Sequence, residues 1–263
     1  MSPLVMTVAL AASALFPLQA QESPRELLTP ADLVERGFEA SRVVMMNEAH
    51  SGLRRCKRTR LIGRLVLPRA HAAGVRHLAA EALKPEFVAE ANRTRQLPEV
   101  DRGYLAQADM RELLQAALDL GWTLHAYEAD LQRAPEPGQL VNWREAEQAR
   151  NLVAALESLD DTARMLVWCG NSHLSKVGGP GPDGEPFLPM GQVFWELSGI
   201  EPFAIDQITT VNFDGSGRRA AVWLETYGEQ LAASPARALG FLEDPADGQD
   251  ADARLVALDN ELE

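Results

Sequence analysis

The chain alternates short apolar segments with longer segments of helical periodicity, and four of the short segments end on ionisable side chains. Alternation of this kind predicts β-α-β units and a parallel sheet. The four predicted strands are residues 43–50, 77–81, 123–128 and 165–173. We therefore expect the α/β class, as a single domain with a mainly parallel central sheet flanked by helices and a C-terminal hairpin.

The remaining segments complete the predicted order of elements. Gly74 and Gly121 follow two helical segments and are typical of helix C-caps, while Thr29 before Pro30 is typical of a helix start. Two strand-like segments joined through a Gly-rich turn predict the hairpin. The expected elements are helices at 53–73, 105–120, 142–159 and 191–198, a fifth strand at 203–210, and hairpin strands at 208–213 and 219–225.

The α/β domain is expected over residues 21–242, with different segments at the two ends. Residues 1–20 are largely apolar, end on the small residue Ala20 and contain no charge. This is typical of a secretory signal, and a retained N-terminal helix is the alternative. The expected location is periplasmic or secreted, with no stable membrane span after removal of the signal. Residues 243–263 are acidic and are expected to fray or to form a surface helix.

Composition narrows the classes of partner. The 263 residues include 46% hydrophobic side chains, enough for one large core, and carry 25 Lys and Arg against 38 Asp and Glu, a net charge of −13. Such a charge disfavours non-specific binding to nucleic acid phosphates or anionic lipids. A small-molecule substrate fits better, and the sequence sets no oligomeric state.

Glutamate and histidine side chains occur where the predicted strands end. Because ligands of open α/β sheets bind outside the carboxyl ends of the strands, these side chains are expected to meet in one crevice. They are Glu48, His50, Glu81, Glu128 and His173. Glu48 and His50 are two residues apart on an extended chain and point the same way, so the carboxylate would strengthen His50 as a general base. A surface salt bridge is the alternative for that pair alone.

Positive charge is expected from two predicted helices. Arg144, in the first turn of one helix, is placed to bind a carboxylate or to stabilise an oxyanion. Arg55 and Arg58 belong to a basic cluster at the start of another helix, which favours an anionic substrate group. Solvent-exposed helix faces are the alternative for both. The expected substrate contacts are Arg55, Arg58, Glu128, Gln148 and Asn171.

Other polar residues are expected to have structural roles. Asn142 with Glu145 three residues later resembles a capping box. His125 lies inside the third strand and is expected to be a core or face histidine, and His71 and His77 flank a turn at the opposite edge of the sheet.

The two cysteines are Cys56 and Cys169. Export would permit a disulfide between them, and both lie close in sequence to predicted site histidines. Two separate buried thiols are the alternative.

The segments at the strand ends resemble a known family, the erythromycin esterase and ChaN-like superfamily, to which the TraB/Tiki proteins are distantly similar. Residues 47–50 resemble the family's Gly-Glu-x-His strand end, with Asn47 in place of Gly. Residues 78–81 resemble the second strand's glutamate, residues 142–149 the Arg-containing helix, and residues 170–173 the later histidine. The resemblance covers about residues 43–175.

The resemblance implies an α/β fold and a pocket built on Glu48, His50, Glu81, Arg144 and His173. In the esterase arm the first histidine is a general base towards water, ChaN-like members are associated with haem or iron, and Tiki members with metal-dependent proteolysis. The one-residue gap between Glu48 and His50 is more like the ChaN-like arm, whereas no cysteine for a lipid anchor is present near residue 20.

The sequence therefore predicts an exported hydrolase of an ester, lactone or amide, without a cofactor. His50 would activate water, Glu48 and Glu81 would orient it, and Arg144 with His173 would stabilise the oxyanion or leaving group. One alternative is a divalent-metal-dependent hydrolase or peptidase whose ligands are Glu48, His50, Glu81 and His173. Another is a periplasmic haem, iron or ligand carrier without turnover.

Overall fold

The computed structural model describes residues 26–48, 53–135, 140–181, 185–207, 218–244 and 250–257. The predicted signal, residues 1–20, and His50 lie outside these ranges, as do the side chains of residues 53–56. Within these ranges the chain forms helices and strands around one central sheet.

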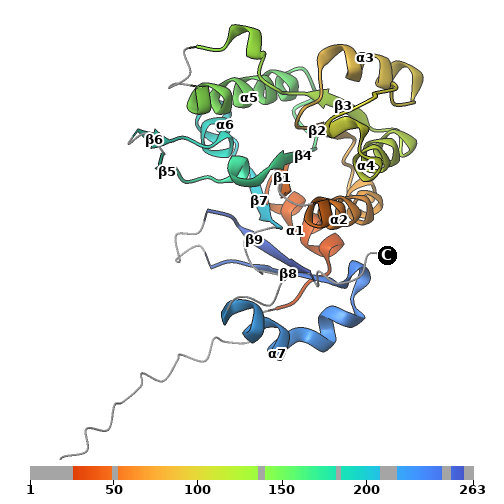
Figure 1. Cartoon of the computed structure of the whole chain (residues 1–263), viewed down its shortest axis with the longest axis vertical. Coiled ribbons are helices and arrows are strands. Elements are labelled where there is room, and N and C mark those ends of the chain that lie inside the picture. Colours follow the sequence, from red (N-terminus) through yellow and green to blue (C-terminus); the bar gives the residue numbers. More distant parts are fainter. Residues whose placement is uncertain are drawn as a thin grey trace, which may run out of the picture.

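Seven strands form the central sheet in the order β3-β2-β4-β1-β7-β9-β8 (Figure 1). Neighbouring strands are parallel except β8 and β9, which form an antiparallel hairpin at the C-terminal end. The strands are β1 (Val43–Glu48), β2 (His77–Ala80), β3 (Thr123–Ala126), β4 (Met165–Gly170), β7 (Phe203–Asp206), β8 (Ala238–Leu242) and β9 (Ala253–Ala257). The predicted fold class is confirmed.

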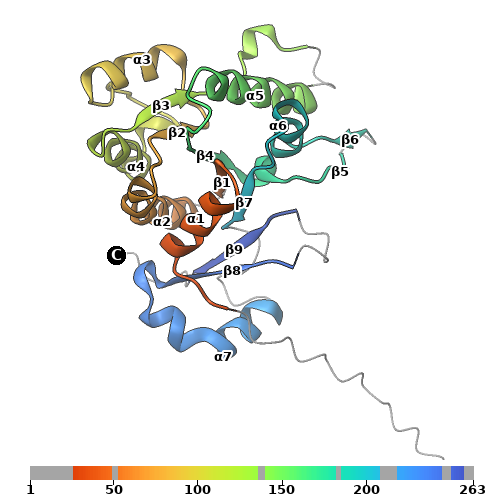
Figure 2. The same ribbon diagram turned by 180° about the vertical axis from the view of Figure 1, so that it is seen from behind.

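Helices cover both faces of the sheet (Figures 1 and 2). They are α1 (Pro30–Ala40), α2 (Leu53–Ala72), α3 (Pro85–Thr94), α4 (Ala108–Asp119), α5 (Leu140–Glu157), α6 (Met190–Ser198) and α7 (Arg218–Ala233). Helix α1 begins as predicted, with the Thr29 hydroxyl accepting from the Asp32 backbone N–H. None of the described helices has a stretch long and apolar enough to cross a membrane.

Each face of the sheet has its own core. Side chains of α1 to α4 pack against Val44, Met46 and Trp168, whereas α5 and α6 pack against Met45 and Val167 on the other face. Alternate residues of one strand point to opposite faces, so every residue of β1 and β4 is buried. A polar group at the end of either strand therefore needs a partner within the protein.

The second predicted hairpin strand is wrong, because residues 218–233 form helix α7, and a hairpin is made by β8 and β9. The first predicted hairpin strand, residues 208–213, lies outside the described residues. Residues 218–233 are rich in Ala, Leu and Glu, which favour a helix. Strand β9 lies within the expected acidic tail, where residues 253 and 254 pair with β7 and the buried apolar run 255–257 pairs with β8.

Cys169 is not part of a disulfide. Cys169 is a buried free thiol whose Sγ lies 3.5 Å from the Met46 carbonyl oxygen. Burial raises the pKa of this thiol. The side chain of Cys169 packs in the core beneath α5 and α6, whereas α2, the helix that contains Cys56, packs on the opposite face of the sheet.

Two histidines at the edge of the sheet bind each other. His77 Nδ1 and His125 Nε2 are 3.0 Å apart, and neither belongs to the polar cluster described below. His71 accepts a hydrogen bond from the Trp122 indole, 2.9 Å away. Burial lowers the pKa of His77, and burial together with repulsion from His77 lowers that of His125 to about 4. The structural roles expected for these histidines agree with this arrangement.

This pair predicts acid sensitivity. Both histidines stay neutral in the folded chain at a pH where the unfolded chain binds protons, so the free energy of unfolding should fall between about pH 6.5 and pH 4 by about 1–3 kcal/mol. His125→Gln removes one of the two titrations and should make the fall shallower. Urea unfolding at several pH values measures it, and an unchanged slope in His125→Gln would contradict the assignment.

Candidate functional site

Polar side chains gather where β2, β3 and β4 end. Glu81 directly follows β2, Glu128 lies two residues beyond β3, and His173 lies in the short 3₁₀ helix Asn171–Leu174 after β4. Arg144 reaches this edge from α5 and contacts all three side chains. The structure therefore brings together four of the predicted site residues. We call these four residues, together with Glu145, the Arg144 cluster: Glu81, Glu128, Arg144, Glu145 and His173.

Arg144 bridges two carboxylates. Its Nη2 donates to Glu81 Oε1 at 2.6 Å and to Glu128 Oε2 at 2.7 Å, and its Nε donates to Glu128 Oε1 at 3.0 Å. Burial lowers the pKa of Arg144, but the hydrogen bonds to Glu128 and Glu81 outweigh burial and the pKa stands above its ordinary value. Gln148, fully buried, donates to Glu128 at 2.9 Å. Glu128 thus fixes the positions of the Arg144 and Gln148 side chains by accepting hydrogen bonds from both.

His173 is held at both ring nitrogens. Nδ1 lies 2.7 Å from Glu145 Oε2, and Nε2 lies 3.5 Å from Glu81 Oε1 and 3.4 Å from Arg144 Nη1. Burial lowers the pKa of His173, but the hydrogen bonds to Glu145 and Glu81 outweigh it and raise the pKa to about 9. The imidazole is therefore protonated at neutral pH and acts as a donor.

Glu145 is a site residue that the sequence interpretation missed. The capping box is wrong, because Asn142 binds the Pro186 carbonyl oxygen and the Leu188 N–H in the loop before α6. Glu145 instead binds His173 and accepts from the Met190 N–H at 2.8 Å. A signal was available: Glu145 stands at the spacing of the buried stripe that continues through Ala149, Leu152 and Leu156.

Glu48 belongs to a second polar cluster, on the opposite face of the sheet. Arg60 of α2 donates to both of its oxygens, at 2.8 and 2.9 Å, and the Trp168 indole donates to Oε2 at 2.7 Å. The side chains of Glu48 and Arg60 are 0% and 1% exposed. Arg60 also donates to Asp109 at 3.0 Å, and the Tyr104 ring centroid lies 4.8 Å from its guanidinium carbon.

The basic cluster at the start of α2 is therefore only partly solvated, because two of its arginines, Arg58 and Arg60, are buried. Arg60 lies on the buried stripe of α2 with Gly63, Leu67 and Ala70, and Arg58 is also buried. The side chain of Arg55 lies outside the described residues. Both missed partners, Arg60 and Glu145, are charged residues at apolar-stripe positions.

Asn47 joins the ends of three segments. Its Nδ2 donates to the Asn171 carbonyl oxygen and to Asp206, both at 2.8 Å, and its Oδ1 accepts from the Gln207 N–H at 2.7 Å. A glycine at this position would lack these bonds. Asn171, predicted to contact substrate, contributes its carbonyl oxygen to this junction and is itself exposed.

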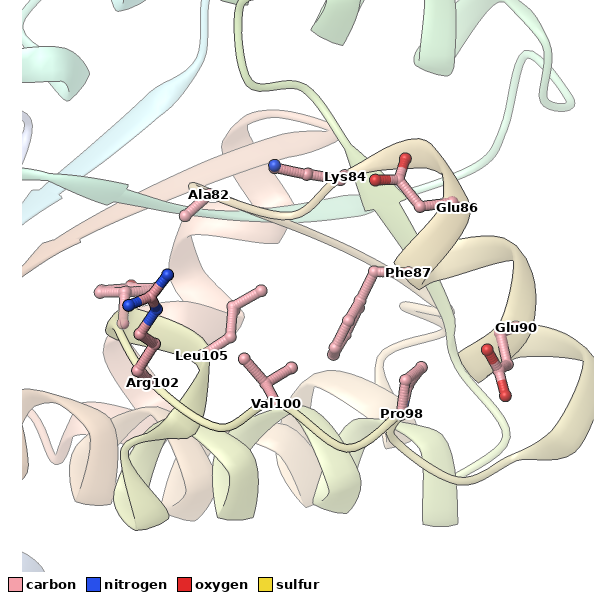
Figure 3. A pocket seen from close by; sticks show the side chains of 10 residues that line it. Ala82, Lys84, Glu86, Phe87, Glu90, Pro98, Val100, Arg102 and Leu105 are labelled. Atoms are coloured by element: carbon pink, nitrogen blue, oxygen red, sulfur yellow. The ribbon is translucent and has the colours of Figure 1, made fainter.

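A cavity of about 470 Å³ adjoins the sheet edge between α3 and the segment before α4 (Figure 3). Its lining residues are Ala82, Lys84, Glu86, Phe87, Glu90, Pro98, Val100, Arg102, Tyr104 and Leu105. Ala82 directly follows Glu81, and Tyr104 contacts Arg60 of the second cluster. The end of the cavity at Ala82 and Tyr104 therefore adjoins Glu81 of the Arg144 cluster, whose charge acts on Tyr104, and Arg60 of the second cluster.

Fold and clusters together define an α/β protein with a charged site at the carboxyl edge of a mainly parallel sheet. The chain matches no family model and no curated protein sequence. It does match solved structures. The effector domain RRSP of the MARTX toxin from Vibrio vulnificus is similar with a TM-score of 0.48 and 12% identity over 68% of this chain and 35% of that one. The chain thus spans about a third of the toxin structures that it matches first.

Two further structures are matched over most of their length. ChaN of Campylobacter jejuni, solved with cofacial haem binding, has a TM-score of 0.46 and 9% identity over 91% of this chain and 99% of that one. A protein from Bacillus cereus has a TM-score of 0.51 and 12% identity over 88% and 92%. The likeness to the Bacillus protein shows a shared fold, and at this identity it shows the fold alone.

The buried ion pair predicts a large effect on stability. Arg60→Met leaves the Glu48 carboxylate buried without its cation and should lower the free energy of unfolding by about 3–5 kcal/mol. Glu48→Gln combined with Arg60→Met should restore part of the loss, because no buried charge remains. Urea unfolding measures both. Arg64→Met, one turn further on and paired at the surface with Glu112, is the matched control and should cost about 0–1 kcal/mol. An equal loss in Arg60→Met and Arg64→Met would contradict the pairing.

Glu145 is expected to set the protonation of His173. Glu145→Gln removes the nearest carboxylate, so the pKa of His173 should fall from about 9 towards 6.5. The stability that this charged pair gives is full below about pH 6.5 and is lost as the pH rises through about 9, and the variant should lose that dependence. Titration of the histidine ring signals by NMR measures the shift. Glu147→Gln, on the same helix, should leave it unchanged, and a pKa that stays near 9 in Glu145→Gln would rule out the role.

Proposed function

We propose that the chain is a hydrolase of esters, lactones or amides in which Arg144 and His173 stabilise the negative charge that develops on the substrate. The observation that supports this most is the position of His173, with Glu145 at one ring nitrogen and with Glu81 and Arg144 near the other. Cationic donors fixed before reaction lower the energy of a tetrahedral intermediate, because they need not reorganise when its oxyanion forms.

The two donors are suited to share one oxygen atom. Arg144 Nη1 and His173 Nε2 are 3.4 Å apart, and when both groups are charged neither nitrogen accepts a hydrogen bond from the other. Their N–H groups are then directed to Glu81 or to a substrate oxygen near it. Arg144 is 29% exposed, so a substrate has access to the guanidinium.

The proposed reaction uses two different proton carriers. A general base takes a proton from water as the water oxygen attacks the carbonyl carbon. When the intermediate collapses, the bond to the leaving oxygen or nitrogen breaks and His173, protonated below about pH 9, returns a proton to that atom. His50 remains the proposed base, because it follows β1 by two residues. Glu48 is fully engaged by Arg60 and Trp168, so its proposed share in orienting His50 is indirect.

The metal and haem alternatives fit the described donors less well. Both oxygens of Glu48 accept hydrogen bonds from Arg60, and the hydrogen bonds to Glu145 and Glu81 raise the pKa of His173, which disfavours the neutral ring that a metal would need. Glu81 is paired with Arg144. No group of three His, Cys, Asp or Glu side chains suited to a metal ion occurs in the described part of the chain. We therefore derive no step through a metal or haem. Export through residues 1–20, with the periplasm or exterior as the site of action, belongs to the same proposal.

A substrate panel tests the hydrolase. Aryl esters, lactones and aryl amides are offered to the full chain and to His173→Gln, with and without a chelator. We expect hydrolysis of at least one class, unaffected by the chelator, and a loss of about 10²–10³-fold in kcat/KM in the variant. The rate should fall as the pH rises through about 9, because deprotonated His173 no longer supplies a proton or a charge.

His125→Gln is the matched histidine control, since His125 lies outside the Arg144 cluster, and it should keep the wild-type rate at pH 7. Loss of activity with the chelator would overturn the metal-free scheme. Absence of turnover across the panel, or equal rates in His173→Gln and wild type, would overturn the proposed function.

A further inference from the structure

The cavity beside the Arg144 cluster has an apolar centre. Phe87 of α3 and the side chains of Pro98, Val100 and Leu105 line it, and in Figure 3 they face one another across the space between the helix and the following segment. A volume of about 470 Å³ lies within the range of small-molecule sites. An aliphatic or aromatic group would bury its surface there.

Charged side chains divide the rim of the cavity by sign. Lys84 and Arg102 extend towards the end where Ala82 lies, whereas Glu90 lies at the other end and Glu86 lies between them (Figure 3). Lys84 and Arg102 are exposed, and no hydrogen bond or ion pair holds either side chain within the described part of the chain. In a protein of net charge −13, two uncommitted cations at one end of an apolar cavity favour an anionic ligand group.

The cationic end is the end nearest the proposed chemistry. Ala82, with a φ of 64°, turns the chain away from the end of β2 directly after Glu81 and leads it to Lys84. Tyr104 also lines the cavity, on the side of the second cluster, and burial together with the nearby Glu48 charge raises the pKa of its hydroxyl. A ligand with its anionic group at Lys84 and Arg102 would thus hold the adjoining atoms near Glu81, the member of the Arg144 cluster that precedes Ala82.

We infer that this cavity binds the acyl part of the substrate, and that the substrate is an acylated carboxylic acid, either an N-acyl amino acid or an O-acyl hydroxy acid. This rests on the proposed function. The acyl chain lies along Phe87, Val100 and Leu105, and the carboxylate pairs with Lys84 and Arg102. Hydrolysis adds water across the scissile bond and releases a fatty or aryl acid and an amino or hydroxy acid. A phosphate dianion is disfavoured by Glu86 and Glu90 on the same rim.

Binding and turnover are measured separately. N-octanoylglycine and its neutral counterpart N-octanoylglycinamide are titrated into the full chain carrying His173→Gln by calorimetry, so that hydrolysis does not consume the ligand. We expect the carboxylate to bind about tenfold more tightly than the amide. Adding Lys84→Ala and Arg102→Ala should remove that preference, whereas Arg93→Ala, which removes an exposed cation near the C-terminal end of α3, should leave it. Val100→Trp, with folding checked by circular dichroism, should abolish binding of both ligands.

The outcomes separate this inference from the hydrolase itself. Equal binding of acid and amide, or a preference that survives the double alanine change, would overturn it. If wild type hydrolyses acyl esters while Lys84→Ala with Arg102→Ala leaves KM for N-octanoylglycine unchanged, the inference fails and the proposed function stands. If the ligand binds as expected but no acyl compound is hydrolysed, the proposed function fails and only the binding site remains.

Discussion

The carboxylate of Glu48 lies at the end of a strand that is covered on both faces, where water does not solvate it. An unpaired charge at such a position costs several kcal/mol, so the fold has to supply a cation there. Arg60 supplies it from α2, and the Trp168 indole completes the shell. The same requirement is met on the other face, where Arg144 of α5 pairs with Glu81 and Glu128. Each helix is thereby fixed to the carboxyl edge of the sheet by one arginine.

The side chains of Arg60 and Arg144 differ in their exposure to solvent. Arg60 is 1% exposed and its ion pair fills the space between α2 and the sheet, so its role is structural. Arg144 is 29% exposed and lies beside a protonated histidine. The division follows from strand alternation, since Glu48 points to the face covered by α1 to α4 and Arg144 approaches from the face covered by α5 and α6. One crevice was expected, and the sheet instead separates its acidic groups into a fully buried pair and a cluster that is partly exposed at Arg144.

The alternating pattern was enough to predict the sheet and the edge at which Glu81, Arg144 and His173 meet, because parallel strands of one sheet end at the same edge. The hairpin was misplaced because a Gly-rich turn at 214–217 is a local signal, whereas the pairing of β8 with β9 depends on burial against β7, which the sequence does not display. Arg60 and Glu145 were missed for another reason. A charged residue in the apolar stripe of a helix is not expected to be buried unless a partner of opposite charge from another element is known, and the sequence does not identify that partner. His50 stays a prediction.

The charge of the Arg144 cluster favours a resting state with His173 protonated. Glu81, Glu128 and Glu145 face Arg144 and His173, so loss of the imidazole proton leaves three carboxylates against one guanidinium. In the proposed hydrolase, the same imbalance would draw a proton back after His173 has given its proton to a leaving group, and the donor would be restored for the next cycle. The same imbalance keeps His173 from acting as the base towards water. A hydrolase built on this cluster therefore needs a separate base, which is the role proposed for His50.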